Sequence, residues 1–400
     1  MSTPSNPKGV PLLDLKAQYE QVGPQIEQLA LSVLRSGHYI LGAVGKQLEE
    51  SVAEICGTKY GVGVANGTDA LELALWAANV GPGDEVITPS FTFAATAEAI
   101  AMRGARPVFI EVDPVTFNID PEAIKSLVNA KTRAIIPVHL YGQSADMEPI
   151  MAFAERFGLK VIEDNAQAIG ATYKGKPTGS FGHMSCISFY PTKNLGAAGD
   201  AGMIVTDDAE LADRLRALRA HGMRTRYYHD EVGINSRLDE IQAAVLMAKL
   251  PHLKEWNEKR NEIAKWYAQA FKNVQGIIIP QVALRRSHVW HQYTIRVAST
   301  GAGRAAINRD DLAKELAARG IGSMCYYPVP CHLQKAFSQY GYRRGDLPVS
   351  ELLAGEVLSL PMYPEMQEWH VKTVVGAIQE IINARMVAGF VPAPSVVAPI

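Results

Sequence analysis

The stretch YGVGVANGTDALELALWAANVGPGDEVIT, residues 60–88, decides the fold. Residues 60–65 and 85–88 are short apolar runs with Val or Ile, which are typical of buried strands. Residues 70–79 between them follow a helical pattern that can form the crossover between parallel strands. A strand, a helix and a second strand in this order predict parallel neighbours in a sheet that helices cover.

The same alternation continues to about Gly222. Further strands are predicted at 107–112, 134–139, 159–162, 185–189 and 202–206, and further helices at 94–102, 121–128, 148–157 and 209–220. We therefore expect a doubly wound α/β domain around a mostly parallel sheet.

The pattern changes after a long helical stretch at 236–271, which Pro251 should kink or break. A strand at 292–297 and helices at 309–319 and 371–385 indicate a smaller α+β unit. The predicted domains and tail are a large domain at 1–250, a small C-terminal domain at 251–400, and an irregular extension at 387–400, which contains three prolines.

Composition excludes several classes of protein. The 400 residues contain 39 Lys and Arg against 41 Asp and Glu, and a net charge of −2 gives no reason to expect a nucleic acid or a membrane surface as partner. No run approaches the roughly 20 apolar residues of a membrane span. The four cysteines form no CxxC pair, which suits a reducing compartment, so a cytoplasmic location is expected.

Polar residues follow three of the predicted strands, where ligands bind in open parallel sheets. The first group, at 66–69, reads Asn-Gly-Thr-Asp and precedes a helix. Gly67 allows close backbone approach, the helix start offers free N–H groups, and Thr68 adds a hydroxyl, which together suit a phosphate. Alternatively, Thr68 or Asp69 only caps the helix. The group is neither GxGxxG nor a Walker loop.

The second group, Glu163 to Gln167, follows the strand at 159–162. Two acids at a strand end can be metal ligands, acid/base groups or part of a solvated loop. A metal site would need further His or Cys ligands. The close pair His288 and His291 is instead expected at the surface or in ordinary packing.

The third group, residues 188–194, contains Lys193 among small and apolar residues. A lysine in such surroundings is a candidate nucleophilic amine, although many lysines are simply solvated.

Together the three groups supply what pyridoxal 5′-phosphate (PLP) needs: an amine for its aldehyde, a carboxylate for its ring nitrogen, a phosphate cup and an aromatic cover for the ring. Lys193, Asp164, the Gly67-Thr68 turn and Phe93 fill these roles, with Phe91 as the competing ring cover. An ionised Asp164 would favour the protonated ring, which withdraws electrons from the substrate carbon.

Over nearly its whole length the chain resembles the DegT-type nucleotide-sugar aminotransferases, which are PLP enzymes of fold type I. The matching stretches are GHYILG (37–42), NGTDALELAL (66–75), GDEVITPSFTFAATAEAI (83–100), PVHLYGQ (137–143), VIEDNAQAIGA (161–171), SFYPTKNLGAAGDAG (188–202), HGMRTRYYH (221–229), GINSRLDEIQAA (233–244) and YYPVPCHLQKAF (326–337).

The resemblance implies roles for individual residues. Lys193 is similar to the Schiff-base lysine that also moves the proton, Asp164 to the partner of the ring nitrogen, and Gln167 to the ligand of the ring hydroxyl. Thr68 and Ser188 resemble phosphate ligands. Further implied contacts are Asn235 with the phosphate of the neighbouring subunit, and Tyr39, His229, Arg237, Tyr327 and His332 with the sugar. A homodimer with shared sites follows from the Asn235 match.

The residues themselves leave alternatives open. Arg237 could form a local ion pair with Asp239 or Glu240. Arg224 and Arg226 suit a diphosphate but could belong to a solvated loop.

The chain departs from the family pattern at two places, since Asn165 stands where alanine is common and Ala201 where glycine is usual. Both changes concern fine geometry near the cofactor. A dehydratase branch carries histidine in place of the lysine, so Lys193 favours amino transfer.

The expected function is PLP-dependent transfer of an amino group from an amino acid, with glutamate as donor, to a keto group of a nucleotide-linked sugar, with pyridoxamine 5′-phosphate as the intermediate cofactor form. The RYYH and GINSRLD stretches resemble members that aminate C3. The alternatives are a regulatory or binding protein of the same fold, and amination of another keto substrate such as a cyclitol.

Overall fold

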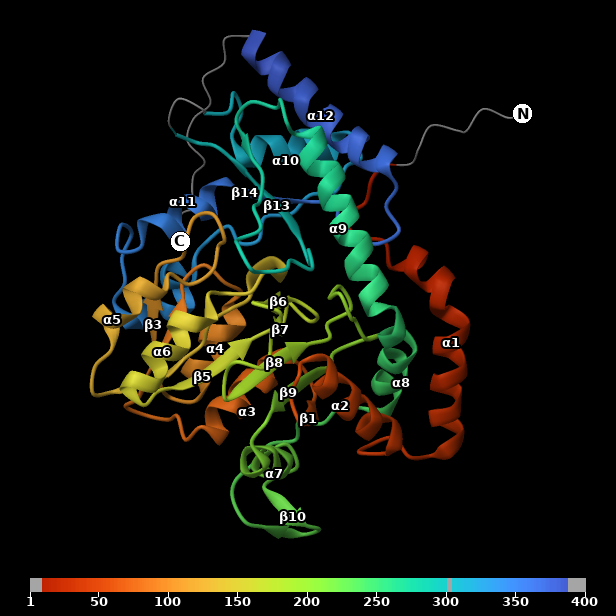
Figure 1. Cartoon of the computed structure of the whole chain (residues 1–400), viewed down its shortest axis with the longest axis vertical. Helices are drawn as coiled ribbons and strands as arrows, with labels where there is room; N and C mark the ends of the chain where they lie inside the picture. Colours follow the sequence, from red (N-terminus) through yellow and green to blue (C-terminus); the bar gives the residue numbers. More distant parts are fainter. Residues whose placement is uncertain (1–8, 301–303, 388–400) are drawn as a thin grey trace.

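The computed structural model describes residues 9–300 and 304–387. Within them, the main feature is a seven-stranded sheet (Figure 1). In sheet order its strands are β1 (Tyr60–Val64), β9 (Gly202–Thr206), β8 (Met184–Ser188), β5 (Lys160–Asp164), β4 (Thr132–Ile135), β2 (Glu85–Pro89) and β3 (Arg106–Ile110). Only β9 runs against its neighbours β1 and β8, and the other pairs are parallel. The prediction of a mostly parallel α/β sheet is confirmed.

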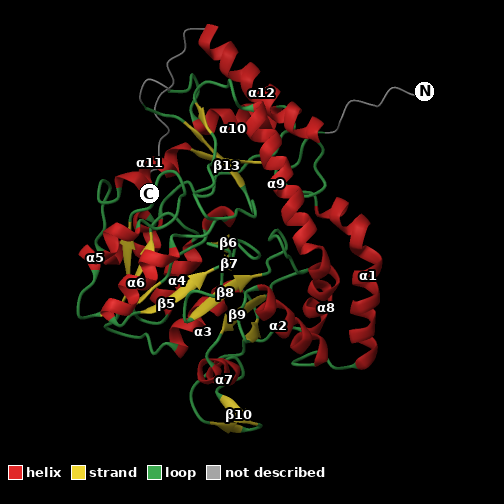
Figure 2. Ribbon diagram, viewed as in Figure 1, coloured by secondary structure: helices red, strands yellow, loops and turns green. Residues whose placement is uncertain are grey.

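Helices lie on both sides of this sheet (Figure 2). In the described ranges they are α1 (Leu15–Ser36), α2 (Ala43–Ile55), α3 (Gly67–Ala77), α4 (Ala94–Met102), α5 (Ile124–Leu127), α6 (Met147–Phe157), α7 (Ala209–Leu218), α8 (Glu240–Lys249), α9 (Leu253–Ala270), α10 (Arg309–Ala318), α11 (Pro348–Glu356) and α12 (Glu368–Val387). None of them is long and apolar enough to cross a membrane.

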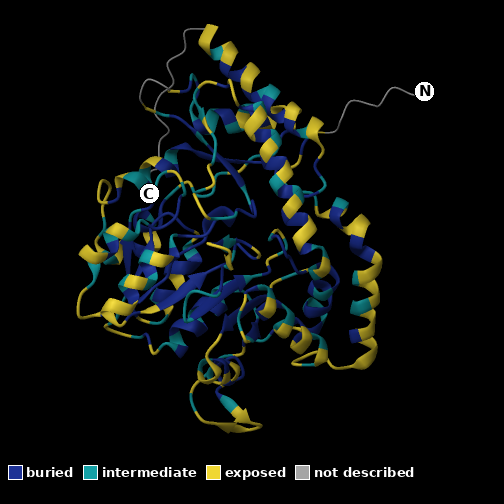
Figure 3. Cartoon of the chain, in the orientation of Figure 1, coloured by how far each residue is buried: buried dark blue, intermediate teal, exposed yellow. Residues whose placement is uncertain are grey.

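The alternation of side chains along the strands divides the interior into layers. In β5, Val161 packs on the side of α5 and α6, whereas Ile162 packs on the side of α3 and α7. Both side chains are fully buried, as are most residues of the central strands (Figure 3). Burial on both faces explains why these strands read as continuous apolar runs.

A second core lies under a three-stranded antiparallel sheet of β12 (Ile277–Ile278), β13 (Tyr293–Val297) and β14 (Val357–Leu360). Helices α9, α10 and α12 cover it, and Val10 from the start of the described chain also contributes. The division into domains at residue 250 stays a prediction.

Four short strands form two hairpins, and their pairs are β6 (Thr172–Tyr173) with β7 (Lys176–Pro177), and β10 (Met223–Thr225) with β11 (Tyr228–His229). The β10–β11 hairpin extends from the body beyond α7 (Figure 1).

Several element boundaries differ from the predictions for physical reasons. A 3₁₀ turn at Leu250–His252 separates α8 from α9, so the predicted long helix is broken at Pro251. The predicted helix at 121–128 consists of a 3₁₀ turn followed by the short α5. Helices α1 and α2 were not predicted. Of the predicted extension 387–400, only Val387 is described, and it ends α12.

Glu240 joins α8 to the start of α2. Its buried carboxylate accepts the N–H groups of Gly42, Val44 and Gly45 at 2.8–3.0 Å. A negative charge at a helix N-terminus satisfies donors that have no partner within the helix and also interacts favourably with the helix dipole.

We expect Glu240→Ala to lower the free energy of unfolding by about 2 kcal/mol or more, because three N–H groups lose their acceptor. Urea unfolding at one protein concentration measures this. Glu50→Ala on the exposed side of α2 is the matched control, since Glu50 makes only a surface ion pair with Lys46. Equal stability of the two variants would contradict the role of Glu240.

Candidate active site

Two adjacent acids end strand β5, and the alternation of the strand directs them differently. Glu163 is fully buried and accepts hydrogen bonds from His139 Nε2 at 2.8 Å and from the N–H groups of Gly179, Phe181 and Gly182 at 2.7–2.9 Å. Burial acts to raise the pKa of Glu163, but the hydrogen bond and charge of His139 and the backbone donors outweigh it and lower the pKa. Glu163 is therefore structural, with its acceptors occupied.

Asp164 lies on the other side of the strand end and is also buried. Its Oδ2 accepts from Thr96 Oγ1 at 2.8 Å, and its Oδ1 accepts from Ala166 N at 3.2 Å. Burial raises the pKa of Asp164, while Thr96, Ala166 and the positive charge of Lys193 oppose the shift. Thr96 was missed by the sequence analysis, because a threonine in the first turn of α4 carries no signal that it faces a distant strand end.

Lys193 lies in the loop of residues 189–201 between β8 and β9 and is partly buried. Burial lowers its pKa to about 8, against the attraction of Asp164, which raises it. A substantial fraction of the amine is therefore neutral near physiological pH and able to act as a nucleophile. The structure brings Lys193 and Asp164 within electrostatic reach of each other.

The predicted phosphate turn lies beside the end of β8. A Cβ on Gly67 would stand 2.7 Å from the Cβ of Ser188, so only glycine permits this approach. The side chain of Asn66 caps α3 by accepting the N–H of Asp69 at 2.8 Å. The alternative of a cap by Thr68 or Asp69 is therefore wrong. The free N–H groups of the first helical turn can meet an anion there.

Two aromatic residues, Phe93 and Tyr327, lie close to each other near Asp164. Phe93 is 55% exposed, whereas Phe91 is 1% exposed and packs against Phe117, so of these two rings Phe93 is the one that a ligand can reach. The ring centroids of Phe93 and Tyr327 are 5.7 Å apart. The Tyr327 hydroxyl accepts from Gln167 Nε2 at 3.2 Å, which joins two predicted site residues.

Other predicted residues lie apart from this cluster. Tyr39, His229 and Asn235 are exposed, and Arg237 is partly buried. Among the described residues, no hydrogen bond or ring contact joins these four to Asp164 or Lys193. His332 is buried, with its Nδ1 2.6 Å from Ser90 Oγ and its Nε2 3.2 Å from Glu351 Oε1.

The structure shows which of these arginines form ion pairs with neighbouring acids. Arg237 makes no ion pair with Asp239 or Glu240 in the described chain, since Glu240 binds backbone N–H groups. Arg224 lies 2.7 Å from Asp213 and 3.5 Å from Asp230, and a contact of Arg224 or Arg226 with a diphosphate stays a prediction.

The family comparison agrees with this geometry. Residues 20–379 match the model of the DegT/DnrJ/EryC1/StrS aminotransferase family. The chain belongs to this family. The predictions of the family, of the fold and of a PLP-dependent aminotransferase are confirmed.

Relatives of this DegT-family aminotransferase carry different names. A pleiotropic regulatory protein of Geobacillus stearothermophilus is 52% identical over 373 residues, covering 93% of this chain and 98% of the relative. A UDP-N-acetyl-3-dehydro-α-D-glucosamine 3-aminotransferase of Acidithiobacillus ferrooxidans is 46% identical over 374 residues, covering 94% and 98%.

Solved structures of relatives show the cofactor. DesV of S. venezuelae, in complex with a ketimine intermediate, has a TM-score of 0.90 and 42% identity, covering 94% of this chain and 99% of DesV. NtdA of Bacillus subtilis, with bound PMP, has a TM-score of 0.87 and 31% identity, covering 96% and 87%. The predicted cofactor is therefore confirmed in close structural relatives.

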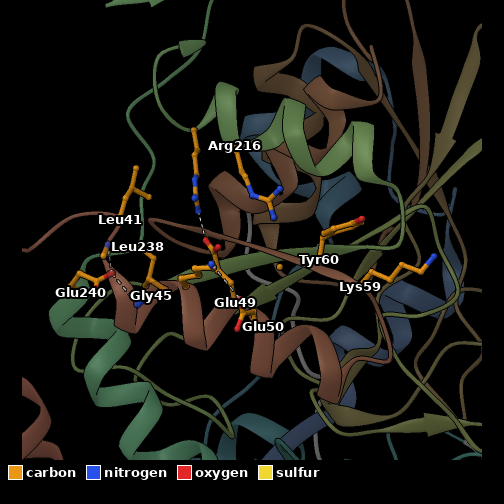
Figure 4. A pocket seen from close by; sticks show the side chains of 13 residues that line it. Leu41, Gly45, Glu49, Glu50, Lys59, Tyr60, Arg216, Leu238 and Glu240 are labelled. Carbon is orange, nitrogen blue, oxygen red and sulfur yellow. Dashed lines mark hydrogen bonds and ion pairs between the residues drawn. The ribbon is translucent and has the colours of Figure 1, made fainter. Parts of the chain in front are cut away.

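A cavity of the aminotransferase lies away from Asp164 and Lys193 (Figure 4). This cavity of about 460 Å³ lies between α2, β1, α7 and the start of α8. Its charged groups are partly paired with one another, as in the ion pair of Arg219 with Glu49 at 2.5 Å. Glu240, which also lines it, binds the start of α2. The cavity includes none of the predicted site residues.

No group of three or more His, Cys, Asp or Glu in the described residues could hold a metal ion. His288 and His291 are both buried, so their expected surface position is wrong and ordinary packing remains the alternative.

We expect Glu163→Gln to lower the free energy of unfolding at neutral pH by about 3 kcal/mol, because the amide places hydrogens against backbone donors. The folded pKa of Glu163 lies below its ordinary value of 4.5, so the carboxylate stabilises fully above that pH. This contribution is lost as the pH falls through the lower folded pKa. Urea unfolding from neutral to acidic pH should show the difference from wild type shrinking, whereas exposed Glu155→Gln should show little difference throughout.

Proposed function

We propose that this aminotransferase moves an amino group from glutamate to C3 of a nucleotide-linked 3-keto sugar. The observation that carries the proposal is the placement of the Lys193 amine, with a pKa of about 8, near the buried carboxylate of Asp164. The name of the Acidithiobacillus relative, a 3-aminotransferase, supports a keto group at C3.

The residues present fit PLP. Gly67 has no side chain where a Cβ would collide with Ser188, and the hydroxyls of Thr68 and Ser188 and the start of α3 would bind the phosphate. Asp164 would bind the ring nitrogen, and Phe93 would cover the ring. When bound, the cofactor withdraws electrons from the carbon that loses a proton.

Lys193 would hold the cofactor and then move protons. A neutral Nζ can take the proton from the α-carbon of the amino-acid donor. The resulting ammonium can then give a proton to the C4′ carbon of the cofactor. A pKa of about 8 suits both steps near neutral pH, because neither form of the amine is rare. Burial beside Asp164 therefore prepares one group for both directions of transfer.

The remaining assignments belong to the same proposal. Two copies of the chain would share their sites, with Asn235 bound to the phosphate in the neighbouring subunit. Residues proposed for the sugar or its segments are Tyr39, His229, Arg237, Tyr327 and His332, with Gln167 at the ring hydroxyl. Because both ring nitrogens of His332 already have partners, its segment rather than its side chain would face the sugar. A cytoplasmic location is proposed from the cysteine pattern.

A regulatory protein is the second candidate, because the Geobacillus relative is named as one. Lys193 separates the two candidates, since pure binding needs no amine with a lowered pKa. Amination of a cyclitol would use the same cofactor residues and differs only in the acceptor.

We expect Lys193→Ala to lower the rate of amino transfer by about a thousandfold or more, because the variant loses its acid/base group. Mass spectrometry with a panel of nucleotide-linked keto sugars measures the product and identifies the acceptor. Borohydride reduction should attach the phosphopyridoxyl group to Lys193 in the wild type. Exposed Lys125→Ala is the control, and a label on another lysine would disprove the assignment.

Mixing two inactive variants tests the shared site. Lys193→Ala and Asn235→Ala should each be weakly active alone, but mixed dimers contain one native site because the two residues come from different subunits. Activity should therefore rise after subunit exchange. Equal activity before and after exchange, with exchange verified by native mass spectrometry, would mean that Asn235 does not act across subunits.

A further inference from the structure

The residue after Lys193 is held from three directions. Asn194 is buried, and its Nδ2 donates to Asn257 Oδ1 in α9 at 2.8 Å and to the Val289 carbonyl at 2.9 Å. These two bonds use both hydrogens of the amide and so determine its orientation. The Oδ1 atom then faces His291 Nδ1 at 3.2 Å.

This contact determines the state of His291. Asn194 Oδ1 can only accept, so Nδ1 of His291 must carry the hydrogen. Burial lowers the pKa of His291, as do the positive charges of Lys193 and Arg260. The imidazole is therefore neutral and donates through Nδ1, and it adds no second positive charge beside the Lys193 amine.

The glycine-rich part of the same loop is bound to α8. Lys249 Nζ donates to the Gly196 carbonyl at 2.8 Å, and Ala198 N donates to Gln242 Oε1 at 2.9 Å. Together with Asn194, these bonds connect the loop to α8, α9 and the segment that enters β13. The backbone at Lys193 is thus restrained while its side chain stays partly exposed.

We propose that His291 is a positioning residue of the aminotransferase, acting through its Nδ1–H···Oδ1 hydrogen bond to Asn194. The inference rests on the proposed role of Lys193. That lysine must leave the cofactor in the first half-reaction and return to the same atom at the end of the second, which requires a backbone that does not move with it. His291 holds the loop of residues 189–201 through this bond to Asn194. Because its imidazole is neutral, His291 places no second positive charge beside Lys193.

Isosteric variants test which nitrogen matters. In His291→Asn, an amide N–H can replace Nδ1–H, whereas His291→Gln places its amide near the Nε2 position and His291→Phe offers no donor. We expect His291→Asn to keep kcat within about threefold, and the Gln and Phe variants to lose about 10- to 100-fold with a smaller change in KM, since misplacement of a reacting group lowers the rate of chemistry.

A second measurement does not depend on turnover. Competitive acetylation of the apoprotein across pH, followed by peptide mass spectrometry, reports the pKa of Lys193. This pKa should stay near the wild-type value in His291→Asn and shift in His291→Phe. The double variant Asn194→Ala/His291→Phe should lose no more kcat than Asn194→Ala alone, because Asn194→Ala already removes the bond that His291→Phe removes.

Several results would overturn the proposal. Retention of kcat by His291→Gln but not by His291→Asn would assign the role to Nε2. Normal kcat and normal Lys193 labelling in all three variants, or losses that follow the melting temperature alone, would leave His291 a packing residue. A phosphopyridoxyl label away from Lys193 in the reduced wild type would instead refute the proposed function, so the two failures are distinguishable.

Discussion

The end of β5 places two buried carboxylates in adjacent positions, and the site depends on their different surroundings. Because neighbouring side chains of a strand point to opposite faces, Glu163 and Asp164 meet unrelated partners. Glu163 receives four donors, mainly from the loop that precedes β8, and this satisfied charge holds the strand end in place. Asp164 receives only two, and its charge remains available to the Lys193 side. Glu163 therefore stabilises the end of the strand, and Asp164 is left free for its proposed role beside Lys193.

The predicted phosphate site likewise depends on local groups and does not need a large net positive charge. A net charge of −2 first indicates only that no polyanion is the partner. In the structure, the predicted phosphate turn combines the start of α3, a glycine beside Ser188 and two hydroxyls. Such groups bind a small anion through local dipoles and hydrogen bonds, and they need no excess of basic residues.

Much of the sheet could be predicted from the sequence, because its strands are buried on both faces and read as apolar runs. The strand predicted at 60–65 is found at Tyr60–Val64, and the predicted site residues include Asp164 at the end of β5 and Lys193 in the loop after β8. Local pattern could not reveal Thr96 beside Asp164 or His291 beside Asn194, since these partners are far apart along the chain. Helix α1 was missed, and Pro24 inside it obscures its pattern.

The reversal of β9 has a consequence for how the chain could be rearranged. If β8 and β9 were parallel, a crossover helix would have to connect them. They are antiparallel instead, and residues 189–201 join them directly. The lysine is thus carried by a closed loop whose two ends are hydrogen-bonded to each other. Inserted segments or new chain termini there would displace the amine, whereas surface turns such as that at Gly81–Gly83 lie outside this closed loop. Changes of chain length at such surface turns therefore disturb the lysine less than changes within this one connection.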